Sequence, residues 1–359
     1  MPNLSTAGYA LVLPGEAMWG AFQTGFANQM ADQLRDAGYG QAPYRATVGS
    51  SSGSLVATAL AGGPVAHDFA RSCWIEFGRA ARFRPWELRN PYPAALQQVF
   101  DRGLIDIEKA YQSPTQIILT AAHYNPEDLA SFGRGWADLV ASGVGRVFKR
   151  GRESASALQE RAADLMEEGG KLFSPRFFTN KPKLPPSAEG SEDWTVVKDS
   201  GEMRKAVEAS SRIPFLYGNP IENGAELLID GVFANNAPVH LALETGARHV
   251  FIVTSSKSGN VFDRPVQSIL KRSGRKLLGR TGLCDLLSGT RPLDLDALRE
   301  RYPGQEIHVV HPDKEISVNR FFETDASVFS ALYDMGVRMA LQHRHVVTRP
   351  TGEEVLAAE

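Results

Sequence analysis

The chain has few of the features that mark secreted, membrane-spanning or nucleic-acid-binding proteins. Two of its 359 residues are cysteine, Cys73 and Cys284, which is too few for a disulfide framework. No apolar run reaches the roughly 20 residues of a transmembrane helix, and the first residues lack the basic segment of a secretion signal. A formal net charge of −2 gives no general electrostatic case for binding nucleic acid. We therefore expect a cytoplasmic protein.

Phosphate-binding loops and metal-ligand spacings are also missing. The first glycine-containing turn, Pro14 to Gly20, reads Pro-Gly-Glu-Ala-Met-Trp-Gly. It contains neither G-x-G-x-x-G nor G-K-[ST], so it predicts neither a dinucleotide site nor a P-loop. Because no cluster of ligand residues shows metal spacing, we expect no metal and no cofactor.

What is present is the pattern of a globular α/β protein, with 43% hydrophobic and 22% charged residues. The apolar run 9–13 leads through a turn into a helical pattern over 21–37, and a second strand, turn and helix follow from 44 to 60. Two such units predict a mainly parallel sheet covered by helices. Further strands are expected at 115–121, 226–229, 248–254 and 305–310, and further helices at 202–211, 235–245, 266–280, 283–287, 294–301 and 328–343.

The second strand–helix turn carries the pattern G-x-S-x-G, as Gly49-Ser50-Ser51-Ser52-Gly53. In a strand–turn–helix context this pattern indicates a nucleophile elbow, where a serine lies on a strained turn at a helix N-terminus. Three serines are adjacent, and the positions of the two glycines favour Ser51 as the nucleophile.

Residues 126–190 differ in character from the rest of the chain. Apolar and basic residues alternate between 136 and 152, and a segment rich in proline, serine and charge follows from 180 to 193. We expect a helical cap or lid inserted into one domain that spans 1–359. A short basic amphipathic segment can also lie on a membrane surface, so peripheral membrane contact is a second expectation.

Four segments, in this order, together resemble the patatin-like phospholipases. They are the turn Gly15 to Gly20 with the following Gly20-Ala21-Phe22-Gln23-Thr24-Gly25, the serine motif at Ser51, Ala209-Ser210-Ser211-Arg212-Ile213-Pro214, and Asp230-Gly231-Val232-Phe233-Ala234-Asn235-Asn236-Ala237-Pro238-Val239. The resemblance covers roughly residues 9–60 and 205–255.

This resemblance implies a three-layer α/β/α fold and a serine acyl hydrolase that acts on lipid or phospholipid esters. It implies a dyad of Ser51 as nucleophile and Asp230 as base, without a catalytic histidine. An oxyanion hole is expected in the first glycine turn, at the backbone amides of Gly15, Glu16 and Ala17. Asp230 would need a raised pKa to act as a base, and partial burial could supply it.

The glycine turn departs from the family pattern G-G-G-x-R-G. Glu16 and Ala17 replace glycines, and Trp19 replaces the arginine and its positive charge. Val232 stands where the family has the second glycine of D-G-G. A carboxylate at Glu16 would repel an oxyanion unless it points away.

Other readings of the site stay open. Six histidines follow Asp230 in the chain, among them His240, His249, His308 and His311, so the chain order Ser-Asp-His of an α/β-hydrolase triad is possible. A patatin-like fold that has lost activity and serves as a binding module would also fit the altered turn. An enzyme could equally pass the acyl group to an acceptor other than water.

Overall fold

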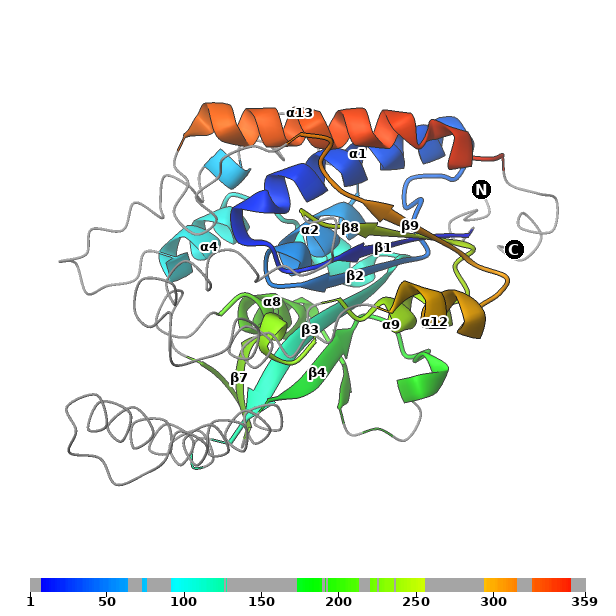
Figure 1. The fold of residues 1–359 in the computed structure, drawn as a ribbon. Coiled ribbons are helices and arrows are strands. Elements are labelled where there is room, and N and C mark those ends of the chain that lie inside the picture. The colour runs from blue at the N-terminus through cyan, green and yellow to red at the C-terminus, as the bar shows by residue number, and fades with distance from the viewer. Residues whose placement is uncertain are drawn as a thin grey trace, which may run out of the picture.

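The computed structural model describes residues 8–63, 73–75, 92–125, 127, 173–188, 191, 193–212, 220–224, 226–235, 237–255, 294–314 and 325–349. Within these residues a central β-sheet lies between two layers of helices (Figure 1). The expected α/β/α architecture is confirmed.

The sheet is mixed and mainly parallel, with strand order β5-β4-β3-β2-β1-β8-β9, while β7 pairs with β3, and β6 with β7. The strands are β1 (Tyr9–Leu13), β2 (Ala46–Ser50), β3 (Gln116–Tyr124), β4 (Ser174–Thr179), β5 (Trp194–Val196), β6 (Ile221–Asn223), β7 (Glu226–Asp230), β8 (His249–Val253) and β9 (Glu306–Val310). The parallel pairs are β1–β2, β2–β3, β1–β8, β8–β9 and β4–β5. The contacts β3–β4, β3–β7 and β6–β7 are antiparallel.

The central strands are buried on both faces, which explains their continuous apolar sequence. In β1, Tyr9, Leu11 and Leu13 belong to the larger apolar cluster, whereas Ala10 and Val12 belong to the cluster on the opposite face. This alternation follows from the two-residue period of a strand.

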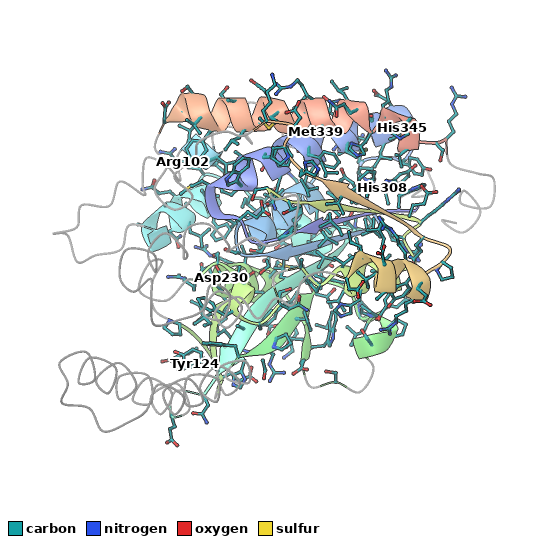
Figure 2. All side chains as sticks on the ribbon, in the orientation of Figure 1. Arg102, Tyr124, Asp230, His308, Met339 and His345 are labelled. Atoms are coloured by element: carbon teal, nitrogen blue, oxygen red, sulfur yellow. The ribbon has the colours of Figure 1, made fainter. Side chains whose placement is uncertain are left out.

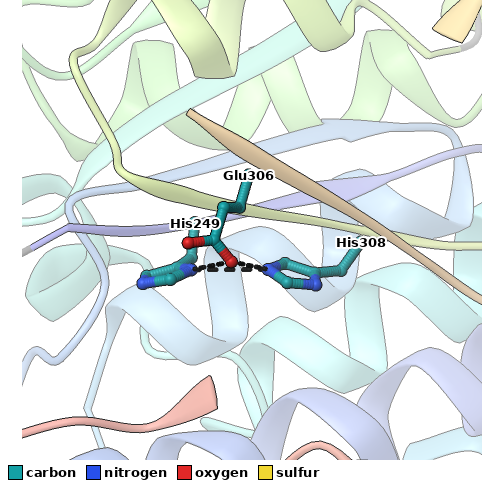
Figure 3. Close-up of side chains that lie close together, drawn as sticks. All are labelled: His249, Glu306 and His308. Atoms are coloured by element: carbon teal, nitrogen blue, oxygen red, sulfur yellow. Dashed lines mark hydrogen bonds and ion pairs between the residues drawn. The ribbon is translucent and has the colours of Figure 1, made fainter. Parts of the chain in front are cut away.

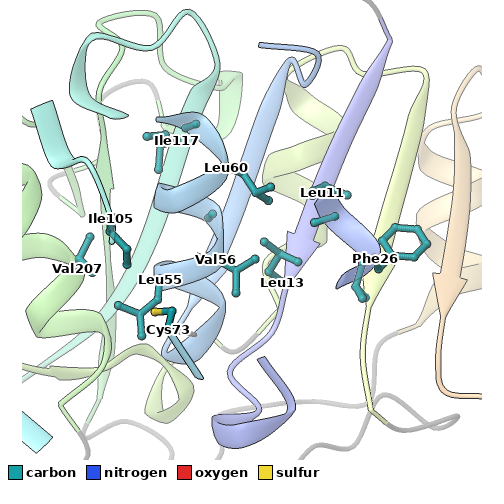
Figure 4. Close-up of a cluster of buried hydrophobic side chains, with 14 of the residues drawn as sticks. Leu11, Leu13, Phe26, Leu55, Val56, Leu60, Cys73, Ile105, Ile117 and Val207 are labelled. Carbon is teal, nitrogen blue, oxygen red and sulfur yellow. The ribbon is translucent and has the colours of Figure 1, made fainter. Parts of the chain in front are cut away.

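Helices cover the two faces unequally. The helices are α1 (Gly20–Asp36), α2 (Ser52–Ala61), α4 (Tyr92–Asp101), α5 (Ile107–Gln112), α8 (Ser200–Ser210), α9 (Val239–Glu244), α12 (Leu295–Arg301) and α13 (Ala326–Gln342). Side chains of α1, α2, α4, α8 and α13 build the larger cluster, part of which Figure 4 shows between α2 and the strands. α9 and α12 pack on the opposite face.

The predicted cap at 126–190 lies mostly outside the described residues, as do the helices expected at 266–280 and 283–287. The described end of that segment is part of the fold itself, because Ser174–Thr179 form β4, which pairs with β3. A single domain over 1–359 stays a prediction. Among the described helices, none has the length and apolar character needed to cross a membrane.

Candidate active site

The site forms where two strands meet end to end along the same edge of β3. The nine-residue β3 pairs in parallel with β2 as far as Ser50, which lies opposite Thr120. The next residue of β3, Ala121, lies opposite Asp230, the last residue of the antiparallel strand β7. The carboxyl ends of β2 and β7 therefore point at each other, and the turn at Ser51 lies beside Asp230.

This arrangement corrects one step of the sequence argument. In the mainly parallel sheet that the sequence predicts, the turns at Ser51 and Asp230 would meet because parallel strands end at the same edge of the sheet. β7 is instead antiparallel to β3 and lies in line with β2. The same two residues are brought together, by a different topology.

Ser51 occupies a strained backbone conformation, with φ 51° and ψ −124°. Of the non-glycine residues that the structure describes, it alone has a positive φ, and such a conformation persists only where its surroundings enforce it. Gly49 and Gly53 are needed for this turn. A Cβ on Gly49 would lie 2.5 Å from the Gly53 carbonyl oxygen, and a Cβ on Gly53 would lie 1.8 Å from that of Leu13.

Residues at the end of α8 form hydrogen bonds with both the Ser51 turn and Asp230. The buried Ser210 hydroxyl accepts a hydrogen bond from the Ser51 amide at 3.0 Å and donates one to the Thr120 carbonyl at 2.6 Å. Two residues later, the Arg212 carbonyl accepts from the Asp230 amide at 3.0 Å. These residues belong to the Ala209–Pro214 segment, whose resemblance to the family gave no role for Ser210. Ile213 and Pro214 lie outside the described residues.

Asp230 is fully buried, and its position in the fold is labelled in Figure 2. Its Oδ1 accepts a hydrogen bond from the Val232 amide at 3.0 Å, while Oδ2 has no hydrogen-bond partner among the described residues. Burial raises the pKa of Asp230 to about 7, and the nearby Ser51 side chain and the Val232 amide hold it from rising further. The Ser51 hydroxyl is thus near the carboxyl without a well-formed hydrogen bond, and such contacts often tighten only when substrate binds.

The residue after Asp230 must be glycine. A Cβ on Gly231 would lie 2.1 Å from the Thr120 carbonyl oxygen and 2.7 Å from Ser50 Oγ. Val232, where the family has a second glycine, fits in the core and is 1% exposed. Its backbone N–H is available to Asp230 whatever its side chain.

The Glu16 carboxylate points away from the expected oxyanion position. The Glu16 carboxylate accepts hydrogen bonds from the Thr254 hydroxyl at 2.6 Å and the Ser255 amide at 2.5 Å, beyond the end of β8. The negative charge of Glu16 therefore lies against residues Thr254 and Ser255. The Glu16 amide, one of the expected oxyanion donors, gives its hydrogen bond to Ser52 Oγ at 3.0 Å.

Two further residues of the first motif support the turn. Gln23 Nε2 donates to the carbonyls of Pro14 at 2.8 Å and Val253 at 3.0 Å, and so ties the turn to β8. Trp19 is buried and packs edge-on against Phe22, with ring centroids 6.3 Å apart. The tryptophan side chain thus packs in the core at the position where the family pattern has an arginine.

The positions of His240, His249, His308 and His311 do not suit a triad with Ser51. His249 is the first residue of β8 and His308 the middle residue of β9, whereas Ser51 follows the carboxyl end of β2. His311 follows β9, three strands from β2, which is about 14 Å at roughly 4.8 Å per strand. His240 lies on α9, on the face of the sheet opposite to α2.

A mostly apolar pocket begins one helical turn beyond Ser51. Its lining residues come from α1, α2 and the segments beside them: Thr24, Asn28, Leu55, Val56, Ala59, Leu60, Cys73, Trp74, Leu104 and Ile105. Several of them appear in Figure 4. Burial raises the pKa of the Cys73 thiol to about 12, so this cysteine is an apolar wall and not a nucleophile.

A comparison with models of protein families identifies the family of this chain. The model of the family described as Patatin-like phospholipase matches residues 11–243, which include the glycine turn, the serine elbow, Ser210 and Asp230. The chain belongs to this family. A patatin-like phospholipase domain indicates a lipid hydrolase or esterase in general. No curated protein matches the chain in sequence.

Proposed function

We propose that this patatin-like protein is a serine acyl hydrolase for ester-linked fatty acyl chains, with Ser51 as nucleophile and Asp230 as base. The observation that carries the proposal is that β2 and β7 end against each other along β3. Ser51, a strained residue at the N-terminus of α2, therefore lies beside the buried Asp230 carboxyl, whose pKa is about 7. A serine hydroxyl needs an adjacent base to become a useful nucleophile. A carboxyl with a pKa near the working pH can both accept and return a proton.

The chemistry proceeds in two halves. Ser51 Oγ attacks the ester carbonyl carbon while its proton passes to the Asp230 carboxylate. The tetrahedral intermediate collapses to an acyl-enzyme, and Asp230 returns the proton to the departing alcohol oxygen. Water then attacks the acyl carbon, gives its proton to Asp230 and releases the fatty acid, with Ser51 Oγ taking the proton back. Asp230 ends each half in its starting state.

The oxyanion formed in each half requires backbone donors. We assign these to the turn at Gly15, Glu16 and Ala17, together with the partial positive charge at the start of α2. The Glu16 amide is bonded to Ser52 Oγ, so the Ser52 hydroxyl must turn aside, or itself donate to the oxyanion, when substrate binds.

The acyl chain is assigned to the apolar side chains beside α2, which enclose a cavity with room for about one water molecule and must therefore move apart to admit the chain. Leu55, four residues after Ser51, lies on the same face of the helix start, and the remaining lining is mainly apolar. Burying methylene groups there contributes about 0.8 kcal/mol each. This supports a lipid ester as substrate over a short polar ester.

Covalent labelling tests the dyad directly. We expect wild-type protein to gain the mass of one phosphonyl group from a fluorophosphonate ester, and Ser51→Ala to gain none. Asp230→Asn should label at least about 10³-fold more slowly, because the hydroxyl has lost its base. Ser50→Ala is the matched control, since the Ser50 hydroxyl is buried and has no hydrogen-bond partner among the described residues. It should label like wild type.

Each alternative gives a different result. Adduct on Ser51→Ala would assign the nucleophile to another serine. Near-wild-type labelling of Asp230→Asn would exclude Asp230 as the base. A folded wild-type protein without adduct would favour a binding module, with the Glu16 amide permanently held by Ser52. Product analysis with phosphatidylcholine vesicles, in the presence and absence of an alcohol acceptor, then separates hydrolysis from acyl transfer.

A further inference from the structure

Three ligand-type side chains converge at the sheet edge far from Ser51. His249 is the first residue of β8, and Glu306 and His308 lie on the neighbouring strand β9 (Figure 3). One donor atom from each side chain lies within 4.8 Å of the other two. Ser51 lies beyond the opposite ends of these parallel strands, on the order of 20 Å away at about 3.3 Å per residue.

The strand register brings the three residues together although His249 and Glu306 are 57 positions apart in the chain. His249 lies opposite Glu306 in the β8–β9 ladder, and His308 lies opposite Phe251. Because residues two apart on a strand share a face, all three side chains project from the same face of the sheet. Sequence spacing alone could not reveal this group.

The separations match the edges of a small coordination polyhedron. His249 Nδ1 lies 3.4 Å from His308 Nε2 and 3.5 Å from Glu306 Oε2, and His308 Nε2 lies 3.8 Å from the same carboxylate oxygen. Ligands about 2.0–2.1 Å from a tetrahedral zinc ion are roughly 3.3–3.4 Å apart. A cation therefore fits between these atoms with little movement of the side chains.

Both imidazole rings are held in place by aromatic neighbours. Tyr9 stacks on His249 with centroids 5.0 Å apart, and Phe251 stacks on His308 at 4.7 Å. The His249 side chain is 6% exposed and that of Glu306 55%, so solvent reaches the group from one side.

We propose that His249, Glu306 and His308 form a binding site for one divalent transition-metal ion of the zinc class. Two imidazole nitrogens and one carboxylate oxygen favour zinc over calcium or magnesium, which prefer oxygen ligands. Water occupies the fourth position on the exposed side. The ion joins β8 to β9 at the edge of the sheet and takes no part in the chemistry at Ser51.

Metal binding by the full-length protein tests this proposal. Metal-free protein is equilibrated with zinc, desalted and analysed for metal, and cobalt(II) is titrated while the visible absorption of a tetrahedral complex is recorded. We expect one equivalent of zinc per chain and a higher melting temperature when zinc is present. Glu306→Gln and His308→Gln should each weaken binding more than about 100-fold, because they remove a direct ligand.

His345→Gln is the matched control. His345 lies near the same end of the fold, and its Nδ1 is bonded to the Gln342 carbonyl. It should bind zinc like wild type. Substoichiometric binding by wild type, or equal binding by wild type, Glu306→Gln and His308→Gln, would overturn the proposal and show adventitious surface binding. If His308→Gln does not fold, the exposed Glu306→Gln carries the test.

Discussion

Ser210 connects the two halves of the site through a single hydroxyl. It accepts the Ser51 amide and donates to the Thr120 carbonyl, beside the point where β2 and β7 meet. The strained backbone at Ser51 thus depends on a side chain from α8. Removing this acceptor leaves a buried N–H unsatisfied, which costs about 1–3 kcal/mol.

We therefore predict that Ser210→Ala lowers the rate of Ser51 phosphonylation and kcat for ester hydrolysis, with a smaller effect on KM. Ser211→Ala is the control, because the Ser211 hydroxyl bonds the Val207 and Glu208 carbonyls within α8. Ser210→Thr keeps the hydroxyl and should recover part of the rate. If Ser210→Ala labelled at the wild-type rate, the elbow would not need this anchor.

The pKa of Asp230 sets the pH dependence of the reaction. A base must be deprotonated to accept the Ser51 proton, and burial raises the pKa of this carboxyl from 3.8 to about 7. We predict that the phosphonylation rate rises with pH and reaches half its maximum near pH 7. The measurement is the inactivation rate constant from pH 5 to 9. A rate that stayed constant down to pH 5 would indicate an ordinary carboxylate.

The sequence was sufficient to propose Ser51 from the G-x-S-x-G pattern, and Asp230 from the resemblance to the patatin-like family. It was not sufficient for Ser210 or for the direction of the Glu16 carboxylate. A serine near the end of a helix and a glutamate in a turn have many potential partners. The partners they have, Ser51 and the Thr254–Ser255 loop, depend on packing between distant segments.

At the scale of elements, most central strands and long helices were predicted within a few residues. The direction of β7 was not, because a short apolar run has the same pattern in a parallel and an antiparallel strand. β5 and β6 have three residues each, too few for a periodic signal. β4 was missed because its segment, 174–179, follows a polar stretch that indicated a cap.

Among the described helices, α1 and α13 make the most extensive contact with each other, and Figure 1 shows them side by side. Two glycines permit it. A Cβ on Gly25 would lie 2.1 Å from the Tyr333 carbonyl oxygen, and a Cβ on Gly336 would lie 2.2 Å from that of Phe22. Backbone meets backbone here, so no side chain can move aside to make room.

We predict that Gly25→Ala lowers the free energy of unfolding by about 1–3 kcal/mol or more, since overpacking forces the two helices apart. Gly304→Ala is the control, because a Cβ there has no neighbour within 4 Å. Urea unfolding followed by far-UV circular dichroism measures both. An unchanged midpoint for Gly25→Ala would mean that α13 can shift freely on α1.

At the scale of the whole molecule, the candidate site lowers stability in order to hold a reactive group. The fold buries the Asp230 carboxyl completely, with one oxygen lacking a hydrogen-bond partner among the described residues. Raising its pKa from 3.8 to about 7 corresponds to on the order of 4 kcal/mol at about 1.36 kcal/mol per pKa unit. Strain at Ser51 adds to this cost.

The sign of the pH dependence follows from proton binding. Between about pH 4 and 7 the folded protein binds the Asp230 proton and the unfolded chain releases it. The carboxyl's contribution to stability is therefore complete below the unfolded pKa and is lost as the pH rises through about 7. At pH 8 the folded state bears the full cost of a buried charge.

We predict that Asp230→Asn is inactive but more stable than wild type at pH 8, and that this advantage shrinks by roughly 2–3 kcal/mol when the pH falls to 5. Urea unfolding of both proteins at the two pH values measures it. Asp296→Asn is the control, because the Asp296 side chain is 94% exposed and should give no such pH-dependent difference. An advantage of equal size at both pH values would show that Asp230 does not titrate in this range, and its assignment as a base with a pKa of about 7 would then be wrong.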